Sequence, residues 1–168
     1  MGLDMYLTAN LYISRMDYDR DVNGNLIANQ RQAFTDLVTT LNADTLIEPD
    51  SWTGFKVGVP VGYWRKANQI HNYIVQNHAD GVDECQEILL SSADIRVLRD
   101  LCQEVLDHHN DGGSTAMAES ILPTAQGCFF GSYEYDEYYY ADLVRTVEIC
   151  NRALAAEGID YFVYQASW

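Results

Sequence analysis

The sequence is poor in basic residues, in cysteine motifs and in long apolar runs. Ten lysines and arginines stand against 25 aspartates and glutamates, so the formal net charge at pH 7 is −15. A protein with this charge repels the phosphates of nucleic acids, and we expect no direct nucleic-acid binding. No apolar run approaches the roughly 18 residues of a membrane-spanning helix, so we expect no membrane segment. The excess of acidic residues is typical of a highly soluble protein or of a protein from a salt-rich host. It also fits an acidic surface that occupies a partner's basic groove.

The four cysteines are widely separated, and no two of them form a C-x-x-C pair. Zinc ribbons and thioredoxin-type redox pairs are therefore not indicated. Cys102 and Cys150 fall on the apolar stripes of expected helices, and we interpret them as small core residues in a reducing compartment. The first residues have neither the basic nor the apolar region of a secretory signal. We expect a cytoplasmic protein without a metal or a cofactor.

Composition and pattern favour one folded domain. The residues are 48% apolar and 21% charged, which is typical of a globular chain with its own core. No linker or repeat interrupts the chain, so we expect 1–168 to be a single domain. The patterns predict an α+β fold, with a mostly antiparallel sheet of about five strands and three or four helices packed on one side. The expected strands lie within 1–16, 55–59, 87–90, 127–131 and 159–166, and the expected helices are 30–47, 61–75, 93–109 and about 140–156.

Residues 61–75, VGYWRKANQIHNYIV, form the segment richest in groups that could hold a ligand. Apolar residues recur there at helical spacing, as at Tyr63, Ala67 and Ile70. This spacing predicts a helix that begins directly after Pro60 and buries one face against the core.

The polar residues of this segment are the principal candidates for a site. Trp64, Asn68 and His71 form the row beside the apolar stripe, where a polar group either finds a protein partner or meets a ligand. Arg65 and Lys66 fall in the first turn of the expected helix, where cations oppose the helix macrodipole. Two interpretations stay open for these cations. They pair with some of the many carboxylates, or they hold an anionic ligand.

Both ends of the chain add candidates. Asp4 and Tyr6 share one face of the first expected strand, and the Asp4 carboxylate is either a buried salt-bridge partner, which we favour, or a ligand-binding group. The terminal Trp168 is expected to dock onto the body of the protein, where it closes a pocket or seals the core.

A tyrosine-rich run, YEYDEYYY, precedes the last expected helix. Its candidate ligand-binding members are Tyr133, Tyr135 and Asp136. Tyrosine provides a large contact area at a low entropic cost, which suits a recognition surface. We expect about half of these tyrosines to pack against the start of the helix instead.

Three parts of the sequence carry a resemblance. They are the opening MGLDMYL at 1–7, the core YWRKANQIH within 61–75, and 121–168 with its YDEYY motif and closing Ser-Trp. Together they resemble a family of small proteins that is common in phage and prophage genomes, whereas residues 17–53 match that family poorly. The resemblance implies a phage accessory protein in the host cytoplasm that counteracts a host defence system.

The first functional hypothesis is a non-enzymatic binder, in two versions. In one, Arg65, Lys66, Asn68 and His71 form a cup with the tyrosine run and Trp168 for an anionic, ring-bearing ligand such as a nucleotide signal. In the other, the acidic, tyrosine-rich surface docks onto a host defence protein. Association with a second copy of the chain stays open in both.

The alternative hypothesis is a small hydrolase or nucleotide-processing enzyme. In that case His71 acts as an acid or base beside Asp4 or Asp136. The sequence contains no nucleophile elbow, no H-E-x-x-H zinc motif and no phosphate loop, so we rank the enzyme below the binder.

Overall fold

The computed structural model describes residues 2–27, 29–47, 53–127 and 130–168. The chain divides into two compact units, Met1–Ala9 with Val59–Trp168, and Asn10–Gly58. We call them the main unit and the small unit and describe each by itself. That the whole chain folds as a single domain stays a prediction.

The fold is α+β, as expected, and its antiparallel sheet has four strands in the order β2-β1-β4-β3. The strands are β1 (Asp4–Ser14), β2 (Gly54–Arg65), β3 (Ile88–Leu90) and β4 (Tyr161–Ser167). Of the strand expected at 127–131, residues 127, 130 and 131 have no regular secondary structure, and 128–129 lie outside the described residues.

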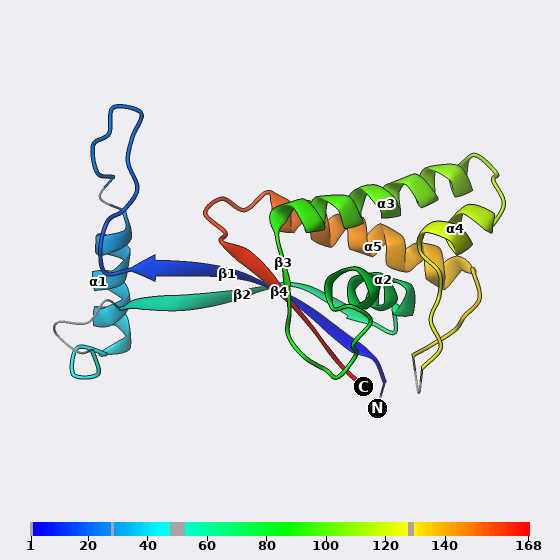
Figure 1. The fold of residues 1–168 in the computed structure, drawn as a ribbon, viewed down its shortest axis with the longest axis horizontal. Helices are drawn as coiled ribbons and strands as arrows, with labels where there is room; N and C mark the ends of the chain where they lie inside the picture. Colours follow the sequence, from blue (N-terminus) through cyan, green and yellow to red (C-terminus); the bar gives the residue numbers. More distant parts are fainter. Residues whose placement is uncertain (1, 28, 48–52, 128–129) are drawn as a thin grey trace. The chain divides into compact units, whose positions relative to one another are not determined.

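The described residues form five helices (Figure 1). They are α1 (Gln30–Leu41), α2 (Asn68–His78), α3 (Ser92–Asn110), α4 (Ala116–Ile121) and α5 (Glu137–Leu154). In the main unit α3 and α5 lie side by side and run in opposite directions (Figure 1). Their starts follow from capping: Ser91 and Asp94 form a capping box before α3, and the Asp136 carboxylate accepts the Tyr138 and Tyr139 amides at the start of α5.

The prediction of a helix at 61–75 is wrong for the first half of that range. Strand β2 runs through Pro60 as far as Arg65, and α2 begins only at Asn68. Valines and aromatic residues before position 65 favour a strand. β2 is an edge strand of the sheet, the kind of strand in which proline is tolerated. Lys66 makes the turn with a φ of 63°, so Arg65 and Lys66 are not in the first turn of a helix.

The small unit contains α1 and the outer parts of β1 and β2. Phe34 is the buried residue of α1, and its ring lies 5.1 Å from that of Phe55 on β2. The helix ends at Leu41, earlier than the expected residue 47, because Asn42 adopts the left-handed conformation of a C-cap.

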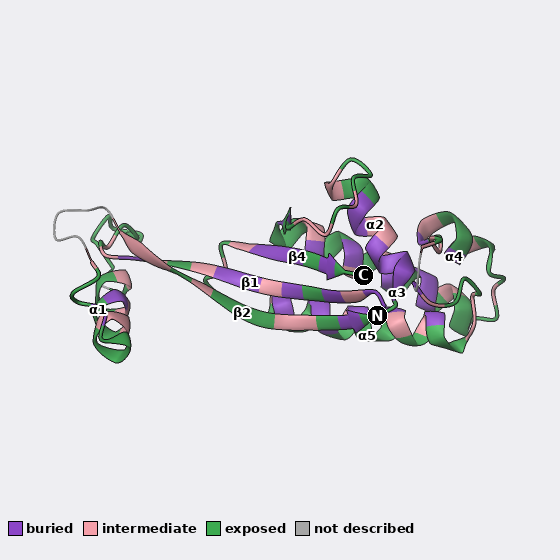
Figure 2. Cartoon of the chain, turned by 90° about the horizontal axis from the view of Figure 1, so that it is seen from below, coloured by how far each residue is buried: buried purple, intermediate pink, exposed green. Residues whose placement is uncertain are grey.

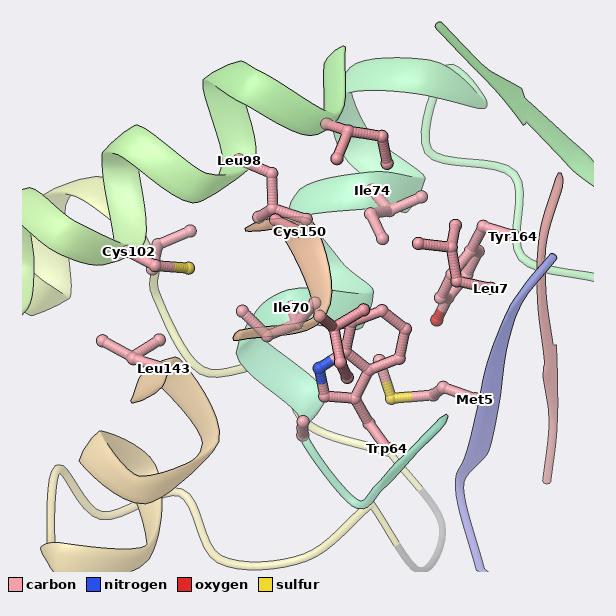
Figure 3. Packing of buried hydrophobic residues seen from close by; sticks show 14 of the residues in the cluster. Met5, Leu7, Trp64, Ile70, Ile74, Leu98, Cys102, Leu143, Cys150 and Tyr164 are labelled. Atoms are coloured by element: carbon pink, nitrogen blue, oxygen red, sulfur yellow. The ribbon is translucent and has the colours of Figure 1, made fainter. Parts of the chain in front are cut away.

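The core of the main unit lies between the sheet and helices α2, α3 and α5 (Figure 3). Every second side chain in the first half of β1 is buried on this face, whereas β4 has three consecutive buried residues, Phe162 to Tyr164 (Figure 2). Cys102 and Cys150 are fully buried among leucine and isoleucine side chains, as expected, and burial raises the pKa of both thiols. The fully buried residues with the largest side chains are Trp64, Tyr164, Phe162, Leu3, Met5 and Leu7.

We predict that Leu143→Ala lowers the free energy of unfolding by about 2–5 kcal/mol, because it leaves a cavity in this core. Leu143 is 0% exposed. The adjacent Val144 is 46% exposed, and Val144→Ala is the matched control, with an expected change of about 0.5 kcal/mol or less. Urea denaturation measures both values. Equal losses in the two variants would contradict the placement of α5.

Candidate functional site

The Asn68 side chain is used inside the protein. It is buried at the start of α2, and its amide nitrogen donates to the carbonyl oxygens of Phe130 (3.2 Å) and Ser132 (2.9 Å). Its amide oxygen accepts the Ala125 amide at 2.9 Å. These three bonds attach residues 125, 130 and 132 to α2, and they use both amide hydrogens and one of the two lone pairs of the Asn68 side chain.

The His71 ring is also matched internally. Its Nδ1 lies 2.7 Å from the Tyr164 hydroxyl and its Nε2 lies 3.0 Å from an oxygen of Asp83. Burial raises the pKa of Tyr164, so its hydroxyl stays protonated and can donate to Nδ1 while Nε2–H donates to Asp83. Trp168 docks back onto the body of the protein, as expected, with its ring 5.6 Å from that of His71.

The enzyme alternative loses its predicted pairs. Asp83, rather than Asp4 or Asp136, is the carboxylate beside His71. The Asp136 carboxylate caps α5, and Asp4 accepts a hydrogen bond from the Tyr63 hydroxyl. With a ring that is 2% exposed, His71 does not meet a substrate from solvent.

Asp4 and Tyr6 lie on the face of β1 that is turned away from the core. Tyr6 is 48% exposed and its ring contacts that of Tyr63, at 5.4 Å. The hydrogen bond to Asp4 raises the pKa of Tyr63. Asp4 is half-buried and hydrogen-bonded to a tyrosine, and no cation pairs with it within the described residues.

Trp64 belongs to the core, so its expected contact with a ligand is wrong. It is 1% exposed, and its indole nitrogen donates to the Thr146 hydroxyl at 2.9 Å. Tyr135 and Tyr133 are partly accessible. The Tyr135 hydroxyl accepts the Thr124 amide at 3.3 Å, and the Tyr133 hydroxyl donates to the Gly127 carbonyl at 3.2 Å.

Arg65 and Lys66 keep their charges exposed and line a cavity of about 360 Å³, which we call the Arg65 cavity. Neither cation has a carboxylate within 4.0 Å in the part of the chain that the structure describes. The cavity lies at the end of β2 and beside the starts of α2 and α5. Its other lining residues are Gln69, Gly131, Ser132, Glu134, Asp136, Tyr138, Tyr139, Ala141 and Asp142.

The Asp142 carboxyl in this cavity has a perturbed pKa. Burial raises its pKa to about 6, although the hydrogen bond from Gln69 and the charge of Arg145 act in the opposite direction. The Gln69 bond is long, at 3.5 Å, and it is the one hydrogen bond to this carboxylate from the described residues.

A larger hollow of about 710 Å³ lies between α3 and α5, and we call it the α3–α5 groove. Its floor is apolar and includes Leu106, Tyr140, Val144 and Val147. Its remaining lining residues are Gln103, His109, Asn110, Tyr135, Asp136, Glu137, Ala141 and Glu148.

The groove follows from the pattern of α5, which is apolar over more of its circumference than the core uses. Leu143 is 0% exposed, whereas the neighbouring Val144 is 46% exposed. At one end the His109 ring stacks on Tyr140, with the ring centres 3.6 Å apart. The sequence patterns did not predict this groove. The position of Val144, beside the buried stripe of α5, was the available signal.

In the described ranges we find no cluster of three or more His, Cys, Asp or Glu side chains that could hold a metal ion. No described helix is long and apolar enough to cross a membrane. Comparisons of the chain with protein-family profiles, with curated proteins and with solved structures gave no match.

The perturbed carboxyl gives a pH-dependent prediction. Because the pKa of Asp142 is raised from 3.8 to about 6, the folded state holds this proton more tightly than the unfolded state. The free energy of unfolding therefore falls as the pH rises from about 4 to 6 and Asp142 loses its proton. Above that range the charged carboxylate destabilises the fold. We predict that Asp142→Asn raises the midpoint of thermal unfolding at pH 8 by on the order of 2–4 °C.

At a pH of about 3.5 the two proteins should unfold at nearly the same temperature, because the aspartate is then largely protonated in both the folded and the unfolded state. Scanning calorimetry at both pH values measures the difference. A variant that is less stable than the wild type at pH 8 would contradict a desolvated carboxylate.

Proposed function

We propose that the protein acts by binding, and that the α3–α5 groove docks a basic amphipathic segment of a partner protein. The observation that carries this proposal is an apolar floor, open to solvent at Val144 and bordered by the carboxylates of α5 and its N-cap. It corresponds to the docking version of the binder hypothesis.

The shape of the groove suits a helix or a helix-like segment. Two antiparallel helices form its walls, and Leu106, Tyr140, Val144 and Val147 supply apolar contacts along its length. A partner helix inserts apolar side chains at positions i, i+3 or i+4, and i+7 into a groove of this kind. Tyr140 adds an aromatic surface of the type that dominates recognition interfaces.

Charge selects the occupant. Asp136, Glu137 and Glu148 line the groove, and no lysine or arginine is among its described lining residues. The net charge of −15 adds a long-range field of the same sign. Such a field accelerates encounters with cationic partners and disfavours acidic ones. The occupant therefore carries lysine or arginine beside its apolar face.

The biological partner follows from the resemblance of 1–7, 61–75 and 121–168 to phage and prophage proteins. A phage accessory protein that acts in the host cytoplasm meets host proteins, and we propose that the groove covers a basic surface of a host defence protein. The small-ligand version of the binder loses two members of its cup, because Asn68 and His71 have internal partners.

The test uses a synthetic helical peptide with leucines at i, i+3, i+4 and i+7 and lysines between them, followed by fluorescence anisotropy. We predict binding that weakens in about 0.5 M salt, since screening removes the attraction of the carboxylates. Val144→Glu should weaken binding at least about tenfold, because it places a charge in the apolar contact.

The matched control is Val97→Glu, which adds the same charge at a valine of α3 that is 49% exposed and does not line the groove. It should bind the peptide like the wild type. The same variants serve in cells that carry a phage-defence system: the wild type and Val97→Glu restore phage plating, and Val144→Glu does not. Equal binding, or equal rescue, by Val144→Glu and Val97→Glu would exclude the groove as the docking site.

A further inference from the structure

The Arg65 cavity is a second place where a ligand can bind, and it is separate from the floor of the α3–α5 groove. Its volume of about 360 Å³ is near the lower end of the range of about 300–1,000 Å³ for small-molecule sites. A ligand of this size is closer to a single nucleotide than to a peptide or a dinucleotide.

One wall of the cavity is positive. Arg65 ends β2 and Lys66 forms the turn that follows, so two consecutive cations line the same hollow. In a chain with 25 acidic residues, exposed cations readily find carboxylate partners, yet these two have none within 4.0 Å among the described residues. A guanidinium and an ammonium that line one hollow can bind a phosphate by charge-assisted hydrogen bonds.

A second feature of the lining is a carboxylate with few hydrogen-bond donors around it. The Asp142 carboxylate is half-buried, and the Gln69 amide reaches it only at 3.5 Å. A desolvated carboxylate with one long hydrogen bond gains most from a ligand that brings two N–H groups on one edge. The Watson–Crick edge of guanine offers such a pair, whereas adenine presents one amino group beside a ring nitrogen that would face the carboxylate.

Tyr138 supplies an aromatic face. It is 71% exposed in the first turn of α5 and lines the cavity. A tyrosine ring in this position can stack on a base, an interaction worth about 1–3 kcal/mol per base in single-stranded nucleic-acid sites.

The remaining carboxylates limit the charge of the ligand. Glu134 and Asp136 also line the cavity, so three carboxylates, with Asp142, oppose two cations. Asp136 is engaged by the amides at the start of α5. A lining with this balance disfavours triphosphates and free multivalent anions, and it suits one phosphate attached to a donor-bearing ring.

We propose that the Arg65 cavity binds a guanine-type nucleoside monophosphate, with its phosphate on Arg65 and Lys66, its base edge on Asp142 and its ring against Tyr138. This ligand site goes beyond the docking function of the groove and does not depend on it.

The experiment is isothermal titration calorimetry of the full chain with GMP, AMP, GTP, guanosine and inorganic phosphate. We expect GMP to bind most tightly, with AMP and guanosine at least about tenfold weaker, since each loses a charge-assisted contact. Arg65→Gln and Asp142→Asn should each weaken GMP binding about tenfold to a hundredfold. Arg152→Gln, which removes an exposed arginine of α5 outside the cavity, is the matched control and should leave binding unchanged.

Three results would overturn the proposal. The first is no heat of binding with GMP at millimolar concentration, and the second is inorganic phosphate binding as tightly as GMP. The third is GMP binding that is equal in the wild type, Arg65→Gln and Asp142→Asn. Asp142→Asn distinguishes a loss of binding from a loss of folding. It is expected to stabilise the fold while it weakens GMP binding, whereas a folding defect would lower the stability. Val144→Glu should bind GMP normally, which separates this site from the groove.

Discussion

Three hydrogen bonds from the Asn68 side chain connect parts of the chain that are 57 to 64 residues apart, and both candidate sites depend on them. They attach Ala125, Phe130 and Ser132 to the start of α2, shortly before the chain enters α5. Gly131 and Ser132 line the Arg65 cavity, and Asp136 caps α5 and borders both hollows. A buried amide whose three partners are backbone groups is costly to replace, since each partner would lose its bond.

The internal hydrogen bonds of the core also determine which polar side chains remain available to a ligand. The side chains that the core uses for its own hydrogen bonds, Asn68, His71 and Trp64, are 1–2% exposed. The groups left to solvent are those that the core does not use: two cations at the end of β2, a half-buried carboxylate, and the apolar side of α5 that faces away from the sheet. The two sites that we propose therefore both lie beside α5, and the sheet and α2 support them.

Much of the fold could be predicted from local patterns. The patterns predicted β1, β4, α3 and α5, because in these elements local propensity and burial agree. The helix prediction for residues 61–67 was wrong because aromatic and apolar residues at helical spacing also fit a strand. In addition, Pro60, which usually marks the boundary of an element, is tolerated on an edge strand. The candidate site was only partly predictable: Arg65 and Lys66 were identified, but the partners of His71 are 12 and 93 residues away, and such pairs depend on tertiary packing. The position of the groove likewise required the packing of α3 on α5.

The most direct test of the central claim, that the polar row of α2 stabilises the fold instead of meeting a ligand, is hydrogen exchange of the Ala125 amide in Asn68→Ala and in the wild type. This amide donates to Asn68, so it should be protected in the wild type and exchange freely in the variant. The free energy of unfolding should fall by about 1–3 kcal/mol. An Ala125 amide that exchanges equally fast in both proteins, with unchanged stability, would show that the Asn68 side chain is available to a ligand and would contradict the account.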